Sequence, residues 1–202
     1  MKIDLGDVLV TPFKILSEKW TILVPIFIAL AIQLILDVSV RFAGRRLWGV
    51  GFGTAKFFVL IILEIITYFL LAWQTILFKK YGEEDLSESF SEVSGKFIDV
   101  VIVAIVVGFL VGLGTLAFVI PGLILAIMLV YSPSAVVVKN MGASEAIKES
   151  FDFVFKRGNL VQTIVLLIFV YVVAFIPVVG SYISTFLMML WIPYAYAKFS
   201  EE

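Results

Sequence analysis

Two carboxylates lie inside segments that are long and apolar enough to cross a membrane, and they are the residues best placed for chemistry. Asp37 belongs to the run 21–40 and Glu64 to the run 57–78. An ionised side chain at that depth costs a few kcal/mol, so it normally faces a charged partner, a cavity or water. Two carboxylates that meet at one depth would bind a cation. We therefore predict a metal site at Asp37 and Glu64.

The side chains available as ligands indicate which cation such a site would hold. The sequence contains no histidine and no cysteine, which leaves carboxylate, amide and carbonyl oxygens. Oxygen ligands bind hard divalent cations such as Ca²⁺, Mg²⁺ or Mn²⁺. The lack of histidine also excludes Ser-His hydrolases and removes the commonest general base. We predict a divalent cation as the only cofactor, and no enzymatic activity.

Local pairing is the alternative explanation for both carboxylates. Gln33, Asp37 and Arg41 follow one another at single-turn spacing, which makes a polar stripe on one helix. Glu64 has no basic residue within its own run, so it would reach a loop arginine, or bond a neighbouring hydroxyl while it is protonated. The groups within reach are Arg41 for Asp37, and Arg45, Arg46 or Tyr68 for Glu64. If these pairs form, both acids are structural.

The composition indicates the class of protein that must hold these residues. Of the 202 residues, 62% are hydrophobic and 15% are charged, and the mean hydropathy is +1.12. A soluble domain of this size could not bury so much apolar surface, so most of the chain must contact lipid. The net charge of −1 gives no reason to expect a nucleic-acid partner. The predicted partner is the lipid bilayer.

Six apolar runs are predicted to cross the membrane, which makes the fold an all-α polytopic one. About 20 helical residues, at about 1.5 Å each, span a hydrocarbon core of roughly 30 Å. Pro121-Gly122 and the segment 177–180 are predicted turns. The runs are 21–40, 57–78, 98–120, 123–138, 160–176 and 178–196.

A short amphipathic helix is predicted before each pair of runs. Leu86, Phe90, Val93 and Phe97 form one apolar stripe, and similar stripes precede the first run and the fifth. The tripeptide Glu-Ser-Phe occurs in two of these helices and ends at Phe90 and Phe151. We predict one membrane domain, 1–202, built from the helix-plus-hairpin units 1–80, 83–140 and 143–200.

Glycines in the third run predict close helix packing. Gly108 and Gly112 are spaced by one turn, and Gly114 follows them. Small residues at this spacing let two helices approach each other within a chain or between subunits. We predict a homo-oligomer.

Basic residues predict the orientation in the membrane. Lysines and arginines of short loops gather on the cytoplasmic side. Most of them follow or precede the amphipathic helices, whereas the opposite side has only Arg41, Arg45, Arg46 and Lys56. We therefore predict a multi-pass protein of the cell membrane with both termini in the cytoplasm.

The later half of the chain carries a family resemblance. Pro121-Gly122, a span ending near Pro133, and the sequence Ala-Ile-Lys-x-Ser that ends at Ser150 carry it. This segment resembles the membrane domain that accompanies some bacterial glycerophosphodiester phosphodiesterases, and it is similar to related six-span membrane proteins of unknown function. The resemblance implies a helical membrane fold. It implies no activity, because the chemistry of those enzymes belongs to a separate soluble domain that is not part of this sequence.

Two functions follow from these residues. The first is a cation-binding channel or transporter-like protein that uses Asp37 and Glu64. The alternative is a non-transporting membrane scaffold or accessory protein, which would act through its cytoplasmic amphipathic helices. A conduit needs carboxylates that ions can reach, whereas a scaffold needs them paired or neutral.

Overall fold

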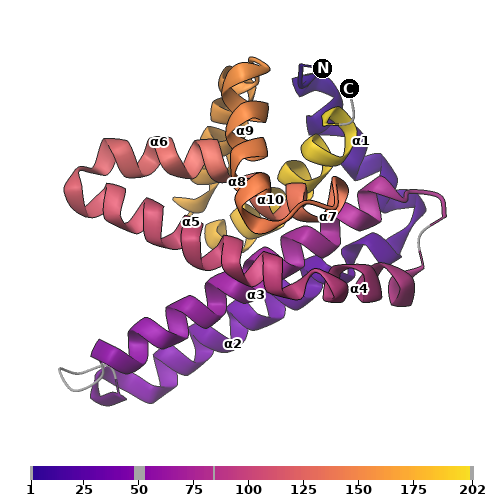
Figure 1. Cartoon of the computed structure of the whole chain (residues 1–202). Coiled ribbons are helices and arrows are strands. Elements are labelled where there is room, and N and C mark those ends of the chain that lie inside the picture. Colours follow the sequence, from indigo (N-terminus) through magenta and orange to yellow (C-terminus); the bar gives the residue numbers. More distant parts are fainter. Residues whose placement is uncertain (1, 48–52, 84, 201–202) are drawn as a thin grey trace.

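The computed structural model of the chain describes residues 2–47, 53–83 and 85–200, and the side chains of 40–58 are outside the description. Every regular element in the described ranges is a helix (Figure 1). The all-α fold is thereby confirmed. The predicted arginine partners of Asp37 and Glu64, which are Arg41, Arg45 and Arg46, have side chains outside the described residues.

Long helices pair in the described part of the chain as α2 with α3, α5 with α6, and α9 with α10. Shorter helices precede or follow these pairs. The bounds are α1 Leu5–Glu18, η1 Trp20–Leu23, α2 Val24–Leu47, α3 Gly53–Lys79, α4 Leu86–Gly95, α5 Phe97–Ala117, α6 Val119–Leu129, α7 Ser132–Val138, α8 Ala143–Phe151, the π-helix η3 Asp152–Lys156, α9 Leu160–Ala174 and α10 Gly180–Phe199.

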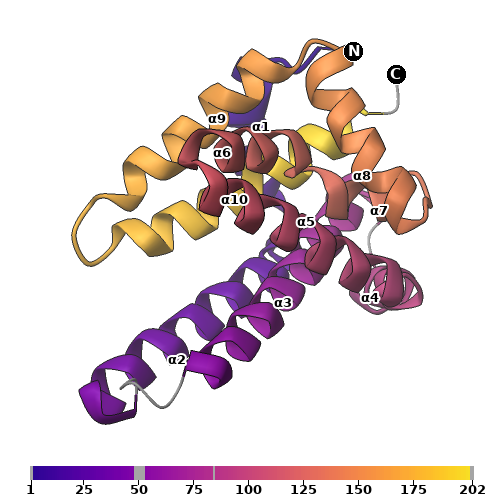
Figure 2. The same cartoon turned by 60° about the vertical axis from the view of Figure 1, so that its left-hand side comes forward.

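The paired helices spread from a common base of short helices. In Figures 1 and 2, the α2–α3 pair extends away from the other two, while α4, α7 and α8 lie at the opposite end of the molecule. Helix α3 is the centre of the arrangement, because it contacts α2, α5, α7 and α10. The two other pairs are joined to it through α5 and α10. A space enclosed by α3, α5 and α10 therefore has walls from all three pairs.

Several helices are long and apolar enough to span a bilayer. Among the described residues there are four by length and composition, and a fifth if the bent pair Ala143–Lys156 and Leu160–Ala174, at 101°, counts as one span. The four are Trp20–Ser39, Val59–Lys79, Phe97–Ala117 and Val119–Val138. Helix α10 is not among them, because serine, threonine and tyrosine reduce its hydropathy. These helices are typical of an integral membrane protein, and six spans stay a prediction.

The turn between α5 and α6 lies earlier than predicted. Helix α5 ends at Ala117, Phe118 is extended with φ −160°, and α6 begins at Val119. Pro121 therefore lies in the first turn of α6, where its missing N–H has no acceptor to lose. The prediction that Pro121-Gly122 breaks the helix was wrong. Gly122 instead packs against α5, where an added Cβ would overlap Thr115.

Candidate binding cavity around Glu64

A cavity of about 720 Å³ lies beside Glu64, between α3, α5, α6, α9 and α10. Most of its wall is apolar. Its polar side chains are Glu64, Thr67 and Tyr68 from α3 and Tyr171 from α9. A cavity of about 300–1,000 Å³ accommodates a small organic molecule, so this one has the size of a ligand site.

Glu64 reaches the cavity because of its position on α3. Tyr68 follows it by one helical turn, and the two side chains form a hydrogen bond. When Glu64 is ionised, the hydroxyl of Tyr68 is the donor, since an ionised carboxylate can only accept. This bond was one of the local partners predicted from the sequence, and the structure confirms it. A carboxylate has about four acceptor positions, so one phenol leaves capacity for another donor or a cation.

Two glycines of α5 keep the space opposite Glu64 open. A Cβ added at Gly108 would lie 3.8 Å from Glu64 Cγ, and one added at Gly112 would meet no atom within 4 Å. Both residues line the cavity. Close packing within the chain, which the spacing of Gly108 and Gly112 predicted, occurs instead at Gly114, where an added Cβ would lie 2.9 Å from Gly122 Cα. Gly108 therefore lies against Glu64 of α3, whereas Gly112 faces open space.

Asp37 lies in a different environment. Its Oδ2 accepts a hydrogen bond from the Tyr182 hydroxyl at 2.7 Å. One turn earlier on α2, Gln33 Oε1 accepts from the Thr185 hydroxyl at 2.8 Å. The polar stripe of α2 therefore contacts α10, whereas Glu64 contacts the cavity beside α5. Residues Tyr182 and Thr185 were missed in the sequence, although their spacing on one helix face was a usable signal.

The predicted metal site gains no further ligands from the fold. No group of three or more His, Cys, Asp or Glu side chains in the described part of the chain could hold a metal ion together. Ca²⁺ takes six to eight oxygen ligands in proteins. A divalent-cation site at Asp37 and Glu64 therefore stays a prediction, and the described side chains do not favour it.

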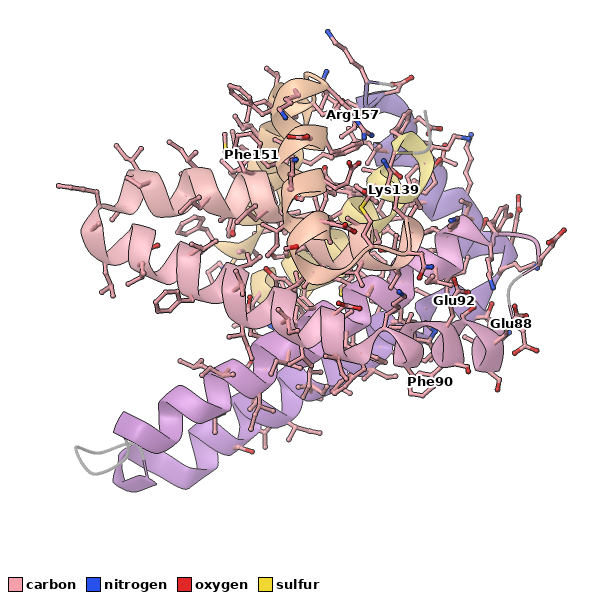
Figure 3. The ribbon with its side chains drawn as sticks, viewed as in Figure 1. Glu88, Phe90, Glu92, Lys139, Phe151 and Arg157 are labelled. Atoms are coloured by element: carbon pink, nitrogen blue, oxygen red, sulfur yellow. The ribbon has the colours of Figure 1, made fainter. Side chains whose placement is uncertain are left out.

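A second group of acids lies on the short helices α4 and α8. Lysine and arginine side chains neutralise these acids. Glu149 of α8 accepts from Lys139 at 2.6 Å and from Arg157 at 2.7 Å, and its side chain is 11% exposed. Figure 3 shows Lys139 and Arg157 on the side where α8 lies, and Glu88 and Glu92 along α4. Lys139 and Arg157 thus form ion pairs within the chain. They are therefore poorly available to lipid head groups or to a partner protein.

Lys80 makes a similar contact with α4. Its ammonium lies 2.7 Å from Glu92 and 2.9 Å from Glu88. Hydrogen bonds with Glu92 and Glu88 raise the pKa of Lys80 to about 12. The lysine is thus charged at every physiological pH. This contact orders α4 at the surface, where an ion pair contributes little to stability because water and salt screen it.

No protein-family model, curated protein or solved structure matches the chain. The resemblance to the membrane domain of glycerophosphodiester phosphodiesterases therefore stays a prediction.

Proposed function

We propose that the chain is an integral membrane protein that binds an amphiphilic organic cation, with the apolar body in the cavity and the cationic group beside Glu64. The observation that carries this proposal is one carboxylate in an otherwise largely apolar cavity of about 720 Å³. A carboxylate attracts a cation strongly where little water screens it. The apolar wall would contribute through burial of the ligand's hydrocarbon surface.

An organic cation fits this lining better than an inorganic one. A hydrated divalent cation needs several oxygen ligands to replace its water. The side chains of the lining supply oxygens from Glu64, Thr67, Tyr68 and Tyr171, and only the first is a carboxylate. The remaining wall of leucine, isoleucine, valine and alanine would contribute nothing to such an ion. The same wall is favourable for an aromatic or alkyl group.

The proposal includes the finer architecture predicted from the sequence. Six spans in three helix-plus-hairpin units, with cytoplasmic termini, would place the cavity at membrane depth. The pairing of α2 with α3, α5 with α6 and α9 with α10 supports this arrangement. The glutamate of each Glu-Ser-Phe tripeptide, Glu88 and Glu149, pairs with a lysine that precedes its helix, and this supports a repeat. Ligand would then enter from the lipid. Homo-oligomerisation remains part of the proposal, as does a transporter-like role.

Equilibrium binding of tetraphenylphosphonium to the protein in nanodiscs tests the function. We expect binding by the native chain and at least a tenfold weaker affinity in Glu64→Gln, which corresponds to about 1.4 kcal/mol. Glu145→Gln is the matched control, because Glu145 makes the same change in charge at an exposed position of α8.

The anion tetraphenylborate, which has nearly the same shape, separates charge recognition from partition into lipid. It should bind the native chain no better than the Glu64→Gln variant. Equal affinity of the native chain and Glu64→Gln for tetraphenylphosphonium would contradict the proposed function.

A further inference from the structure

A second, smaller cavity lies on the other side of α3. It has a volume of about 240 Å³ and is enclosed by α2, α3 and α10. Gln33 and Leu36 of α2 and Thr185 of α10 are among the residues that line it. Helices α3 and α10 line both cavities, whereas α2 lines only the second and α5 only the first.

The second cavity has hydrogen-bond acceptors at one wall. Gln33, whose Oε1 already accepts from Thr185, contributes its amide to the lining. Asp37 lies one turn further along α2, where Tyr182 holds its carboxylate at 2.7 Å. Within the described residues, Tyr182 occupies one of the roughly four acceptor positions of that carboxylate. The second cavity therefore has a carboxylate near it, as the first has Glu64 within it.

Three side chains line both cavities, and they are Thr67, Leu71 and Met188. The Thr67 hydroxyl donates to the Leu63 carbonyl at 2.8 Å, and Leu71 is 2% exposed. Both of these are held in place. Met188 is half-buried, and an unbranched thioether side chain changes rotamer more readily than a branched one. Met188 is thus the side chain between the two cavities that can move, and these three side chains are called the partition below.

We propose that the two cavities are consecutive subsites of one intramembrane path, which Met188 divides and along which an organic cation passes from Glu64 to Asp37. This inference rests on the proposed function, because it takes the same ligand class. It adds a second binding subsite at Asp37 and a positioning role for Met188. Glu64 lines the first cavity, and Asp37 follows Gln33 of the second cavity by one turn of α2, so a carboxylate lies within the first subsite and beside the second.

Single-cysteine labelling tests the path, since the native sequence contains no cysteine. Leu36→Cys places a thiol in the second cavity. The probe is a methanethiosulfonate that carries a triphenylphosphonium group, and N-ethylmaleimide is the neutral reagent. The reaction rate with the cationic probe should fall at least tenfold when Met188→Trp is added, and at least fivefold when Asp37→Asn is added. Met188→Ala should raise the rate.

Leu34→Cys is the matched control position. Leu34 lies on the same helix and is 53% exposed, so it reacts from the lipid without passing the partition. Its labelling rate should stay within twofold in every background. The rate with the neutral N-ethylmaleimide separates a charge effect at Asp37 from a steric block at Met188, and the thermal midpoint of each variant reports whether it keeps the native fold. If Met188→Trp or Asp37→Asn leaves the cationic labelling of Leu36→Cys within twofold of its parent, the path is overturned.

The binding and labelling experiments together distinguish failure of the path from failure of the proposed function. Loss of tetraphenylphosphonium binding in Glu64→Gln tests the first cavity alone. If that loss is observed while Leu36→Cys reacts independently of Met188 and Asp37, the first cavity is a closed site and the second subsite does not exist. If Glu64→Gln binds as the native chain does, the proposed function fails, and the path fails with it because its first subsite is at Glu64.

Discussion

Glu64 and Glu149 are two glutamates in contrasting surroundings. Glu149 has Lys139 and Arg157 within 2.7 Å and a longer contact of 3.4 Å with the Tyr196 hydroxyl. Glu64 has Tyr68 and an apolar cavity. A carboxylate that is already neutralised by two cations holds helices together, whereas one beside an open cavity can accept a ligand. The comparison teaches that exposure to a cavity, and not burial, separates a candidate site from a structural acid.

The largest expected effect is a loss of stability when the structural acid of this pair, Glu149, is neutralised. Glu149→Gln removes the charge that Lys139 and Arg157 share, and leaves two partly buried cations without their counter-ion. The loss should be about 3 kcal/mol, the lower part of the range for a broken buried ion pair, because both cations are partly exposed. The measurement is the thermal midpoint of the protein in detergent, which should fall clearly.

Glu64→Gln is the control for that experiment. Its midpoint should stay close to the native value, because no lysine or arginine in the described part of the chain depends on Glu64. A larger fall in Glu64→Gln than in Glu149→Gln would reverse the assignment of the two acids.

The second effect distinguishes two glycines of the α5–α6 region. A Cβ at Gly122 would overlap Thr115 Oγ1 and lie 2.6 Å from Thr115 N, so Gly122→Ala should destabilise the protein by about 2 kcal/mol. Gly112→Ala should leave stability unchanged or slightly raised, because its Cβ meets open space and alanine favours helix. Parallel thermal midpoints check both. Equal midpoints would show that Gly122 is not a packing residue.

The third effect concerns the cavity volume. Gly112→Leu would extend a side chain into the cavity while Glu64 stays intact, so tetraphenylphosphonium affinity should fall about tenfold, or about 1.4 kcal/mol. Gly95→Leu is the control, because a Cβ there also meets no atom within 4 Å but lies at the end of α4. Binding that is unchanged in Gly112→Leu would place the ligand elsewhere.

The smallest effect separates two serines that share the tripeptide Glu-Ser-Phe. Ser150 Oγ donates to the Met128 carbonyl at 2.8 Å and accepts from Tyr131 N at 3.1 Å. Ser150→Ala should therefore cost about 1 kcal/mol more than Ser89→Ala, since Ser89 Oγ is buried with no hydrogen-bond partner in the described residues. Thermal midpoints of the two variants check this. An equal loss would mean that the two serines bond alike.

The sequence was informative where the signal was local. Hydropathy predicted the helical membrane class, the bond between Glu64 and Tyr68 follows from their spacing on one helix, and the turn between 176 and 180 was expected from Pro177 and Gly180. At Pro121 local reasoning failed, because a proline is compatible with the first turn of a helix as well as with a break.

Contacts between distant segments were beyond such reasoning. Asp37 and Tyr182 belong to different helices of distant segments, and no single-residue pattern pairs them. Gly108 and Gly112 have the spacing of a packing motif, yet whether a glycine face meets a helix or a cavity depends on how the pairs spread from α3. The candidate site could be guessed from one carboxylate, but its volume and walls could not.

The most direct test measures binding and stability together in two variants that each lose one carboxylate. Glu64→Gln should lower tetraphenylphosphonium affinity at least tenfold and leave the thermal midpoint close to native. Glu149→Gln should lower the midpoint and, at a temperature where it is folded, retain native affinity. We therefore expect each variant to lose one of the two properties and to keep the other. Native affinity in Glu64→Gln, measured on folded protein, would contradict a ligand site at that carboxylate.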